Sequence, residues 1–155
     1  MIPGVGAAVV NRALTPRSVV VVGASDQPGK LGTNLVKNLE SYPGDVYYVN
    51  PRRREINGSP VYSSVEAIEA ELDLALILIP VEQVSSAVEQ CASAGVAVSI
   101  ILSAGFHELG EAGTELKRDI LATAAQSGMR LMGPNCTGAI NTAVPLRACM
   151  VAMPD

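Results

Sequence analysis

Residues 23–32 have the composition of a loop that binds phosphate. They read Gly-Ala-Ser-Asp-Gln-Pro-Gly-Lys-Leu-Gly and follow an apolar run that ends at Val22. Glycines let backbone N–H groups approach an anion closely, and a helix that begins at the end of such a loop adds the positive end of its dipole. We expect phosphate contacts from the backbone or side chains of Gly23, Ala24, Ser25, Gly29, Lys30 and Gly32.

This loop departs from both common phosphate-loop patterns. A Walker A loop has the form Gly-x-x-x-x-Gly-Lys-Ser/Thr, whereas five residues separate Gly23 from Gly29, and Leu31 follows Lys30. The dinucleotide fingerprint is Gly-x-Gly-x-x-Gly, but Gln27 stands where its first glycine would be. The segment is therefore a variant phosphate loop. The alternative is a glycine turn that only lets a strand and a helix pack closely.

Three arginines, at positions 52–54, follow the second predicted strand. NAD sites usually have Asp or Glu here, because a carboxylate binds the ribose hydroxyls. This chain has cations here although its net charge is −4. Since a planar guanidinium pairs well with phosphate, the arginines predict a ribose that carries a phosphate. That group would be the 2′-phosphate of NADP or the 3′-phosphate of coenzyme A (CoA), and a solvated basic turn is the alternative.

Three further loops that follow predicted strands give weaker indications. Pro80, after Ile79, ends a strand with an apolar residue that lacks a backbone donor, which suits contact with an adenine or a pantetheine arm. Residues 103–106 offer small side chains and free N–H groups, and an ordinary strand–helix turn would do the same. Residues 133–138 are dense in turn residues, so a structural turn explains them equally well.

No residue stands out as a nucleophile or a metal ligand. Cys136 follows a predicted strand, but the sequence places no histidine to activate its thiol. The single histidine, His107, forms His-Glu-x-x-Glu and lacks the second histidine of a zinc helix. We therefore expect an exposed loop histidine, no catalytic residue and no metal site.

The elements that position these loops alternate along the chain. Short β-branched runs predict strands at residues 18–22, 46–49, 72–79, 96–102 and 129–132. Between them, helical spacing predicts a helix in which Leu31, Leu35, Val36 and Leu39 share one face, and a short helix at residues 64–68 capped by Ser64. It also predicts a helix from Pro80 to Cys91, and one with Leu116, Ile120, Leu121 and Ala124 that ends at Gly128. This alternation predicts an α/β domain with a parallel sheet of about five strands, and ligands bind at the carboxyl ends of such strands.

The chain has 155 residues, the size of one domain. We expect a lead-in segment at residues 1–16 with a helix around Ala7–Leu14, followed by the domain itself at residues 17–142. Residues 143–155 form an apolar tail without helical or strand periodicity. Such a tail either packs on this domain or leads toward a further domain that these residues lack.

Composition argues against several other classes of protein. The negative net charge, 3% aromatic residues and no Trp disfavour nucleic-acid binding. No apolar run approaches the length of a membrane span, and the first residues lack the basic region of a signal peptide. Three cysteines without metal-ligand spacing predict reduced thiols and a cytoplasmic protein.

Five segments, taken in order, resemble the CoA-binding domain of the NDP-forming acyl-CoA synthetases, close relatives of the succinyl-CoA synthetase alpha subunit. They lie at residues 18–32, 49–51, 78–80, 103–106 and 132–136, and the similarity runs from about residue 12 to residue 142. The resemblance implies a Rossmann-type, doubly wound domain that binds CoA. The family makes an acyl-CoA from a carboxylic acid, CoA and ATP or GTP, through an acyl phosphate and a phosphohistidine.

The resemblance also implies a role for each loop. The first loop would hold the CoA phosphates, and the basic residues after the Asn-Pro turn would contact the phosphorylated ADP end. The loops at 79–80 and 103–106 would border the nucleotide and the pantetheine, and the Gly-Pro-Asn-Cys turn would face the acyl-phosphate chemistry. The residues concerned beyond the first loop are Asn50, Pro51, Arg52, Arg53, Ile79, Pro80, Ser103, Ala104, Gly105, Asn135 and Cys136.

In the family, the phosphohistidine and the ATP-grasp part lie outside the CoA-binding domain, and His107 does not match the phosphohistidine. These residues are therefore expected to bind CoA without turnover, with further ligase domains or an ATP-grasp subunit as partners. The same domain opens some fused protein acetyltransferases. An NADP-dependent reductase or NAD(P)-sensing domain also fits the loops, as does a stand-alone CoA-binding regulatory module.

Overall fold

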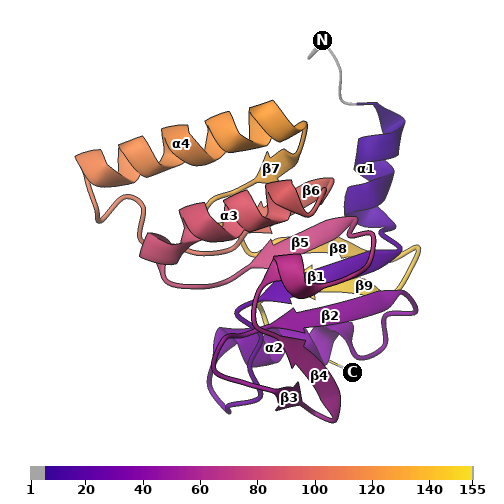
Figure 1. Ribbon diagram of the computed structural model, residues 1–155. Helices are drawn as coiled ribbons and strands as arrows, with labels where there is room; N and C mark the ends of the chain where they lie inside the picture. Colours follow the sequence, from indigo (N-terminus) through magenta and orange to yellow (C-terminus); the bar gives the residue numbers. More distant parts are fainter. Residues whose placement is uncertain (1–5, 155) are drawn as a thin grey trace.

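Seven strands form the main sheet of the computed structural model, which describes residues 6–154 (Figure 1). The strand order is β3-β4-β2-β1-β5-β6-β7, and all neighbours pair in parallel except β3 and β4. A separate antiparallel pair, β8 and β9, forms a small hairpin. The strands are β1 (Ser18–Val22), β2 (Asp45–Val49), β3 (Glu55–Ile56), β4 (Ser59–Tyr62), β5 (Leu74–Ile77), β6 (Val98–Ile101), β7 (Arg130–Met132), β8 (Gly138–Asn141) and β9 (Leu146–Cys149).

Buried apolar runs form the centre of the sheet. Every residue of β1, β5 and β6 is buried. Val20 of β1 lies opposite Tyr47 of β2 on one side and Ala75 of β5 on the other. Apolar runs without polar alternation are typical of parallel strands covered on both faces. The five predicted strands are therefore confirmed, with β5 and β6 shorter than predicted.

The six parallel strands, numbered among themselves along the chain, have the order 3-2-1-4-5-6. Doubly wound sheets that bind dinucleotides have this order, and their ligands lie beyond the carboxyl ends of the strands where the order reverses. In this chain the reversal falls between β1 and β5. The loops that follow Val22 and Ile77 therefore flank the expected ligand position.

The prediction of about five strands is too low because the edge strands give a weak sequence signal. β4 pairs with β2, and β3 turns back on β4 through Asn57 and Gly58, both at positive φ. The Asn-Gly pair marks the turn in the sequence, but its flanking strands are short and β4 contains Pro60. Proline is tolerated at a sheet edge and hides the usual strand pattern.

Helices cover both faces of the sheet. On one face, α3 and α4 pack with the 3₁₀ turns η1 and η2 on a cluster that contains Val20 and Ala75. On the other face, α2 and the β8–β9 hairpin pack on a cluster that contains Val19 and Leu74. Figure 1 shows α3 and α4 side by side, away from α2. The elements are α1 (Ala7–Leu14), α2 (Leu31–Leu39), η1 (Val65–Ala67), η2 (Val81–Gln83), α3 (Val84–Ser93) and α4 (Glu111–Ser127).

The helix predictions are confirmed in position, including α1 and the left-handed Gly128 after α4. Three details are wrong. Ser64 precedes η1, but its side chain makes no capping hydrogen bond. Leu31 is 50% exposed because it begins α2 at the loop, before the residues that pack on the sheet. Leu121 is 60% exposed because it lies one residue beyond the buried Ile120.

Residues 146–149 correct the prediction that the tail lacks strand structure. They form β9, in which Leu146, Ala148 and Cys149 are buried against α2 and the sheet. The buried amide of Asn38 in α2 donates to the carbonyls of Cys149 and Val151, both at 2.8 Å. Of the two possibilities that the sequence left open for the tail, packing on this domain is observed for these residues.

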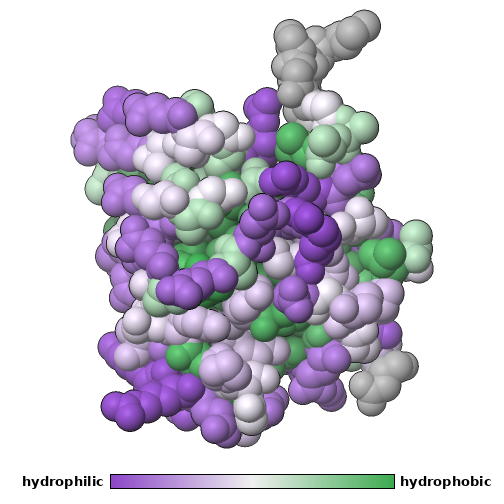
Figure 2. Space-filling model, turned by 45° about the vertical axis from the view of Figure 1, so that its right-hand side comes forward, coloured by the Kyte–Doolittle hydropathy of each residue, from purple (hydrophilic) through white to green (hydrophobic). Residues whose placement is uncertain are grey.

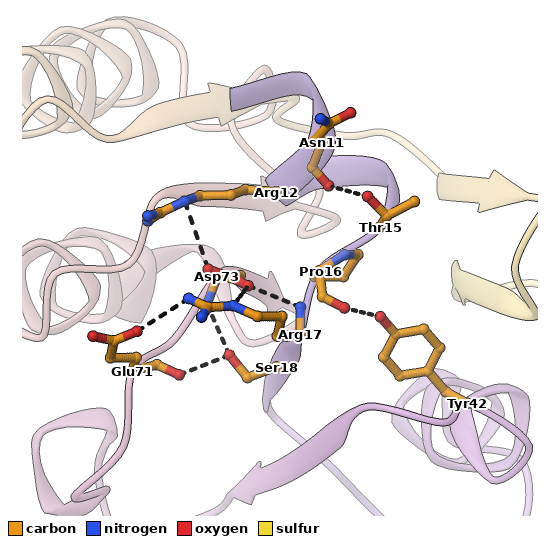
Figure 3. Close-up of polar contacts among 9 residues, drawn as sticks. All are labelled: Asn11, Arg12, Thr15, Pro16, Arg17, Ser18, Tyr42, Glu71 and Asp73. Carbon is orange, nitrogen blue, oxygen red and sulfur yellow. Dashed lines mark hydrogen bonds and ion pairs between the residues drawn. The ribbon is translucent and has the colours of Figure 1, made fainter. Parts of the chain in front are cut away.

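A buried carboxylate organises the amino-terminal edge of the sheet (Figure 3). Asp73, 3% exposed, accepts hydrogen bonds from the Arg17 backbone N–H at 2.8 Å and from Arg17 Nε at 3.3 Å. Its other oxygen lies 3.7 Å from Arg12 Nε, which ties α1 to this edge. The hydrogen bond with Asp73 raises the pKa of Arg17 above its ordinary value. The network joins the start of β1 to the start of β5, opposite the predicted ligand loops.

No helix among residues 6–154 is long and apolar enough to cross a bilayer. In Figure 2, hydrophilic residues cover much of the visible face, with smaller hydrophobic areas between them.

Candidate functional site

The first loop, residues 23–32, connects β1 to α2 and leaves several donors open. α2 begins at Leu31 without a side-chain cap. The Thr33 N–H of its first turn donates to the Lys30 carbonyl, whereas the N–H groups of Leu31 and Gly32 have no acceptor within the helix. Ser25 Oγ accepts a hydrogen bond from Gln27 N at 3.1 Å, which leaves the hydroxyl proton of Ser25 to donate elsewhere. Within residues 6–154, the Lys30 ammonium has no ion-pair partner and is exposed. The loop therefore presents donors suited to an anion.

Glycine is required at different positions of this loop for different structural reasons. A Cβ atom on Gly23 would collide with the carbonyl oxygen of Leu78, and one on Gly32 would collide with that of Gly23. Close packing of strand and helix, the alternative explanation for a glycine loop, thus accounts for both positions. Gly29 differs, because its φ is +82° and no atom lies within 4 Å of its virtual Cβ. Of these three glycines, only Gly29 presents open backbone at the surface of the loop.

Asn50 fastens the second loop to the first. Its Nδ2 donates to the Ala24 carbonyl at 2.9 Å, and its Oδ1 accepts from the Arg52 N–H at 2.9 Å. Its own carbonyl accepts from the Arg53 N–H at 3.3 Å. The side chain of Asn50 is thus occupied by the protein itself. Its role in this structure is to hold the arginine loop beside the glycine loop.

The three arginines are not equivalent. Arg53 Nη2 lies 3.2 Å from Oδ1 of Asp26 in the first loop, and both side chains are about one-third exposed. Arg52 and Arg54 are exposed and form no ion pair within residues 6–154. Sequence reasoning missed Asp26 because it considered the donors of the loop alone. The available signal was the single carboxylate of that loop, which precedes three arginines in a neighbouring loop.

Ser103 connects the third and fourth loops. Its Oγ accepts from the Ile79 N–H at 3.0 Å and donates to the Ile79 carbonyl at 2.7 Å, and the residue is 2% exposed. Its own N–H donates to Ile77. Ser103 thus orients the chain after β5 and has no group left for a ligand. Ile79 is half-buried, whereas Pro80 and Ala104 are exposed at this edge.

The fifth loop lies next to the fourth. The Asn135 N–H donates to the Ser103 carbonyl at 3.1 Å, and Asn135 is exposed with a φ of +58°. Cys136 is half-buried, and its thiol lies 3.5 Å from the Ile101 carbonyl. Burial raises the pKa of Cys136 above its ordinary value. The thiol is therefore protonated at neutral pH, which does not suit a nucleophile.

Direct contacts link the five predicted loops into two groups at the carboxyl edge of the sheet. Asn50 and Arg53 join the first two, and Ser103 and Asn135 join the last three. The groups meet where Gly23 packs on Leu78. His107 is exposed beside the fourth loop, and among residues 6–154 no three His, Cys, Asp or Glu side chains could hold a metal ion. A doubly wound sheet with these loops at its switch point has the architecture of a nucleotide-binding domain.

Comparison with known proteins identifies the family. The family described as "CoA binding domain" matches residues 17–142. The chain is 44% identical over 139 residues to the acetate–CoA ligase (ADP-forming) I of Archaeoglobus fulgidus, with 90% of this chain and 20% of that protein covered. It is 41% identical to the acetate–CoA ligase (ADP-forming) II subunit alpha of Pyrococcus furiosus, with 89% and 30% covered. The chain belongs to the CoA-binding domain family and is the type of CoA-binding domain found in ADP-forming acyl-CoA ligases.

Solved structures agree with this assignment. A crystal structure of a Pyrococcus horikoshii OT3 protein superposes with a TM-score of 0.88 at 40% identity, covering 92% of this chain and 33% of that one. The apo dinucleotide-forming acetyl-coenzyme A synthetase 1 of Ca. Korarchaeum cryptofilum gives 0.85 at 33% identity, covering 91% and 31%. Similarity extends to the succinate–CoA ligase (ADP-forming) subunit alpha 2 of A. fulgidus, at 33% identity. The chain spans 20–30% of the length of the first two relatives named above.

Proposed function

We propose that this domain binds CoA along the carboxyl edge of the sheet, over the switch point between β1 and β5. The observation that carries the proposal is the joining of two loops. Contacts from Asn50 to Ala24 and from Arg53 to Asp26 hold the arginines beside the open donors of the glycine loop. One ligand that carries both a diphosphate and a separate phosphate would use the two loops together.

The parts of CoA distribute over the loops by their chemistry. The diphosphate is bound by the Ser25 hydroxyl, the Gly29 backbone N–H, the Lys30 ammonium and the N–H groups of the first turn of α2. The 3′-phosphate is bound by the guanidinium groups of Arg53 and the exposed Arg52. The pantetheine arm, which is longer and less charged, passes Pro80 and the small residues at 104–105. Its thiol end then lies toward Asn135, the exposed member of the fifth loop.

The proposed parent activity is ligation of a carboxylic acid to CoA with formation of ADP. Support comes from the relatives, which carry this domain within longer acetate–CoA ligases or as an alpha subunit. In this proposal, residues 17–142 supply the CoA, and other ligase domains or an ATP-grasp subunit supply the acyl phosphate. The proposal gives Cys136 no covalent role, in keeping with burial, which raises the pKa of its thiol.

NADP is the second candidate ligand, because arginines beside a glycine loop also suit a ribose 2′-phosphate. Calorimetric titration of the chain with CoA, dephospho-CoA, NADPH and NADH separates the two candidates. We expect saturable CoA binding that weakens when the 3′-phosphate is absent, and no comparable signal from either nicotinamide cofactor. Tight NADPH binding without a CoA signal would overturn the proposal.

A further inference from the structure

Asp26 is the one carboxylate placed among the donors of the phosphate-binding loops. A negative side chain at this position repels a phosphate group. Its presence among the donors therefore calls for a separate role in ligand binding. Its Oδ1 is buried, faces Arg53 Nη2 at 3.2 Å and has no hydrogen-bond partner among residues 6–154. The side chain as a whole is nevertheless 31% exposed. One oxygen is thus directed at the arginine, while part of the side chain remains open to solvent.

This arrangement places an acceptor and a donor fork side by side. Arg53 has five N–H donors, and the contact with Asp26 occupies one terminal nitrogen, so donors remain for a phosphate. The ionised carboxylate only accepts hydrogen bonds, so the ligand group beside it must be a donor, such as a hydroxyl group. The matching ligand therefore carries a hydroxyl and a phosphate on adjacent atoms. A ribose with a 3′-phosphate and a free 2′-hydroxyl has this pattern, and so does a ribose with a 2′-phosphate and a free 3′-hydroxyl. The two differ in which position faces Asp26 once the first loop holds the 5′-diphosphate.

We propose that Asp26 determines specificity by accepting a hydrogen bond from the ribose 2′-hydroxyl while Arg53 binds the neighbouring 3′-phosphate. The inference rests on the proposed function, since it assigns the ribose end of the ligand to these two loops. A ligand with a 2′-phosphate would bring that dianion against the carboxylate. Like-charge contact of this kind rejects a wrong partner more strongly than it affects the right one. Asp26 thereby separates CoA from NADP.

The test uses two isomeric probes of equal charge, adenosine 3′,5′-bisphosphate and adenosine 2′,5′-bisphosphate. Their dissociation constants are measured by calorimetry at one salt concentration for the wild-type chain, Asp26→Asn and Asp45→Asn. Asp26→Asn preserves the shape of the side chain and removes its charge. Asp45→Asn removes the same charge from the exposed start of β2, at the opposite edge of the sheet, and controls for the general effect of net charge. CoA is titrated into each protein in parallel.

The wild-type chain should bind the 3′,5′ isomer at least about tenfold more tightly than the 2′,5′ isomer. Asp26→Asn should reduce that ratio to less than about threefold, mainly by tightening the 2′,5′ isomer, whereas Asp45→Asn should leave it unchanged. An unaltered ratio in a folded Asp26→Asn protein, or a wild-type chain that binds CoA but does not discriminate the isomers, overturns the role of Asp26 and leaves CoA binding intact. If the wild-type chain fails to bind CoA at all, the proposed function itself is wrong.

Discussion

Lys30 and Arg53 carry the positive charge of the candidate site in different surroundings. Lys30 is exposed and free of ion pairs within the described residues, whereas Arg53 is held by Asp26. Lys30 thus acts as a mobile point charge and Arg53 as an oriented fork. This difference supports the proposal that Lys30 binds the flexible diphosphate and Arg53 the rigid ribose phosphate.

Lys30→Ala and Arg53→Ala should each weaken CoA binding by about 1–3 kcal/mol, the usual scale for hydrogen bonds to charged groups. The loss in Arg53→Ala should largely disappear when dephospho-CoA is the ligand, and the loss in Lys30→Ala should persist. Lys37→Ala, an exposed lysine on α2 beyond the loop, is the matched control. Calorimetry measures all three. If both loop variants keep wild-type affinity, the site lies elsewhere.

Cys136 offers a test of whether the fifth loop holds a nucleophile. Burial raises the pKa of its thiol, so the thiolate fraction near pH 7 is smaller than that of a free cysteine. We predict that iodoacetamide alkylates Cys136 more slowly than it alkylates glutathione at pH 7, as followed by peptide mass analysis. The rate should rise as the pH increases past the ordinary thiol pKa. Alkylation at pH 7 that outpaces glutathione would contradict this account.

At the scale of elements, the contacts of Asp73 join the starts of β1 and β5 at the amino-terminal edge, whereas the proposed ligand site lies at the carboxyl edge. Asp73→Ala should lower the free energy of unfolding by about 1.5–3 kcal/mol, because the backbone N–H of Arg17 loses a charged acceptor in a buried position. Glu71→Ala removes only the exposed partner of Arg17 and should change stability little. Urea denaturation compares the two variants. Equal losses of unfolding free energy in the two variants would show that the burial of Asp73 does not determine its contribution to stability.

The sequence predicts central elements better than peripheral ones. β1 and β5 are recognised because strands buried on both faces are apolar at every position. β4 was missed because it is a short, half-buried strand next to the edge of the sheet and contains a proline. β9 was missed because its buried residues are too few to establish a pattern, and its stability depends on pairing with β8 and packing on α2. Such contacts come from distant parts of the chain and have no local signal.

The candidate site shows the same division. The glycine loop and the arginine loop can be proposed from the sequence because phosphate requires donors of these types. The ion pair between Asp26 and Arg53 was not found, because only the parallel pairing of β1 with β2 brings the two loops together. The occupied side chains of Asn50 and Ser103 were not foreseen either. Hydrogen bonds within the protein decide which polar residues remain free for a ligand.

At the scale of the whole molecule, the β8–β9 hairpin is part of the domain although it lies outside the main sheet. Leu146 is fully buried in the cluster that also contains Leu35 of α2, so Leu146→Ala should cost about 2–5 kcal/mol. Ile140 on the other strand is 47% exposed, and Ile140→Ala should cost less than about 1 kcal/mol. Thermal unfolding monitored by circular dichroism measures both. A small loss at Leu146 would mean that the hairpin is only loosely attached.

We propose above that CoA binds at the carboxyl edge of the sheet, over the β1–β5 switch point. The most direct test is a titration of the ¹⁵N-labelled chain with CoA, followed by amide resonances in proton–nitrogen correlation spectra. We expect the largest shifts at Ser25, Gly29, Lys30 and Arg53, and small shifts at Arg17 and Asp45 on the opposite edge. Shifts concentrated at the amino-terminal edge, or none at saturating CoA, would contradict this proposal.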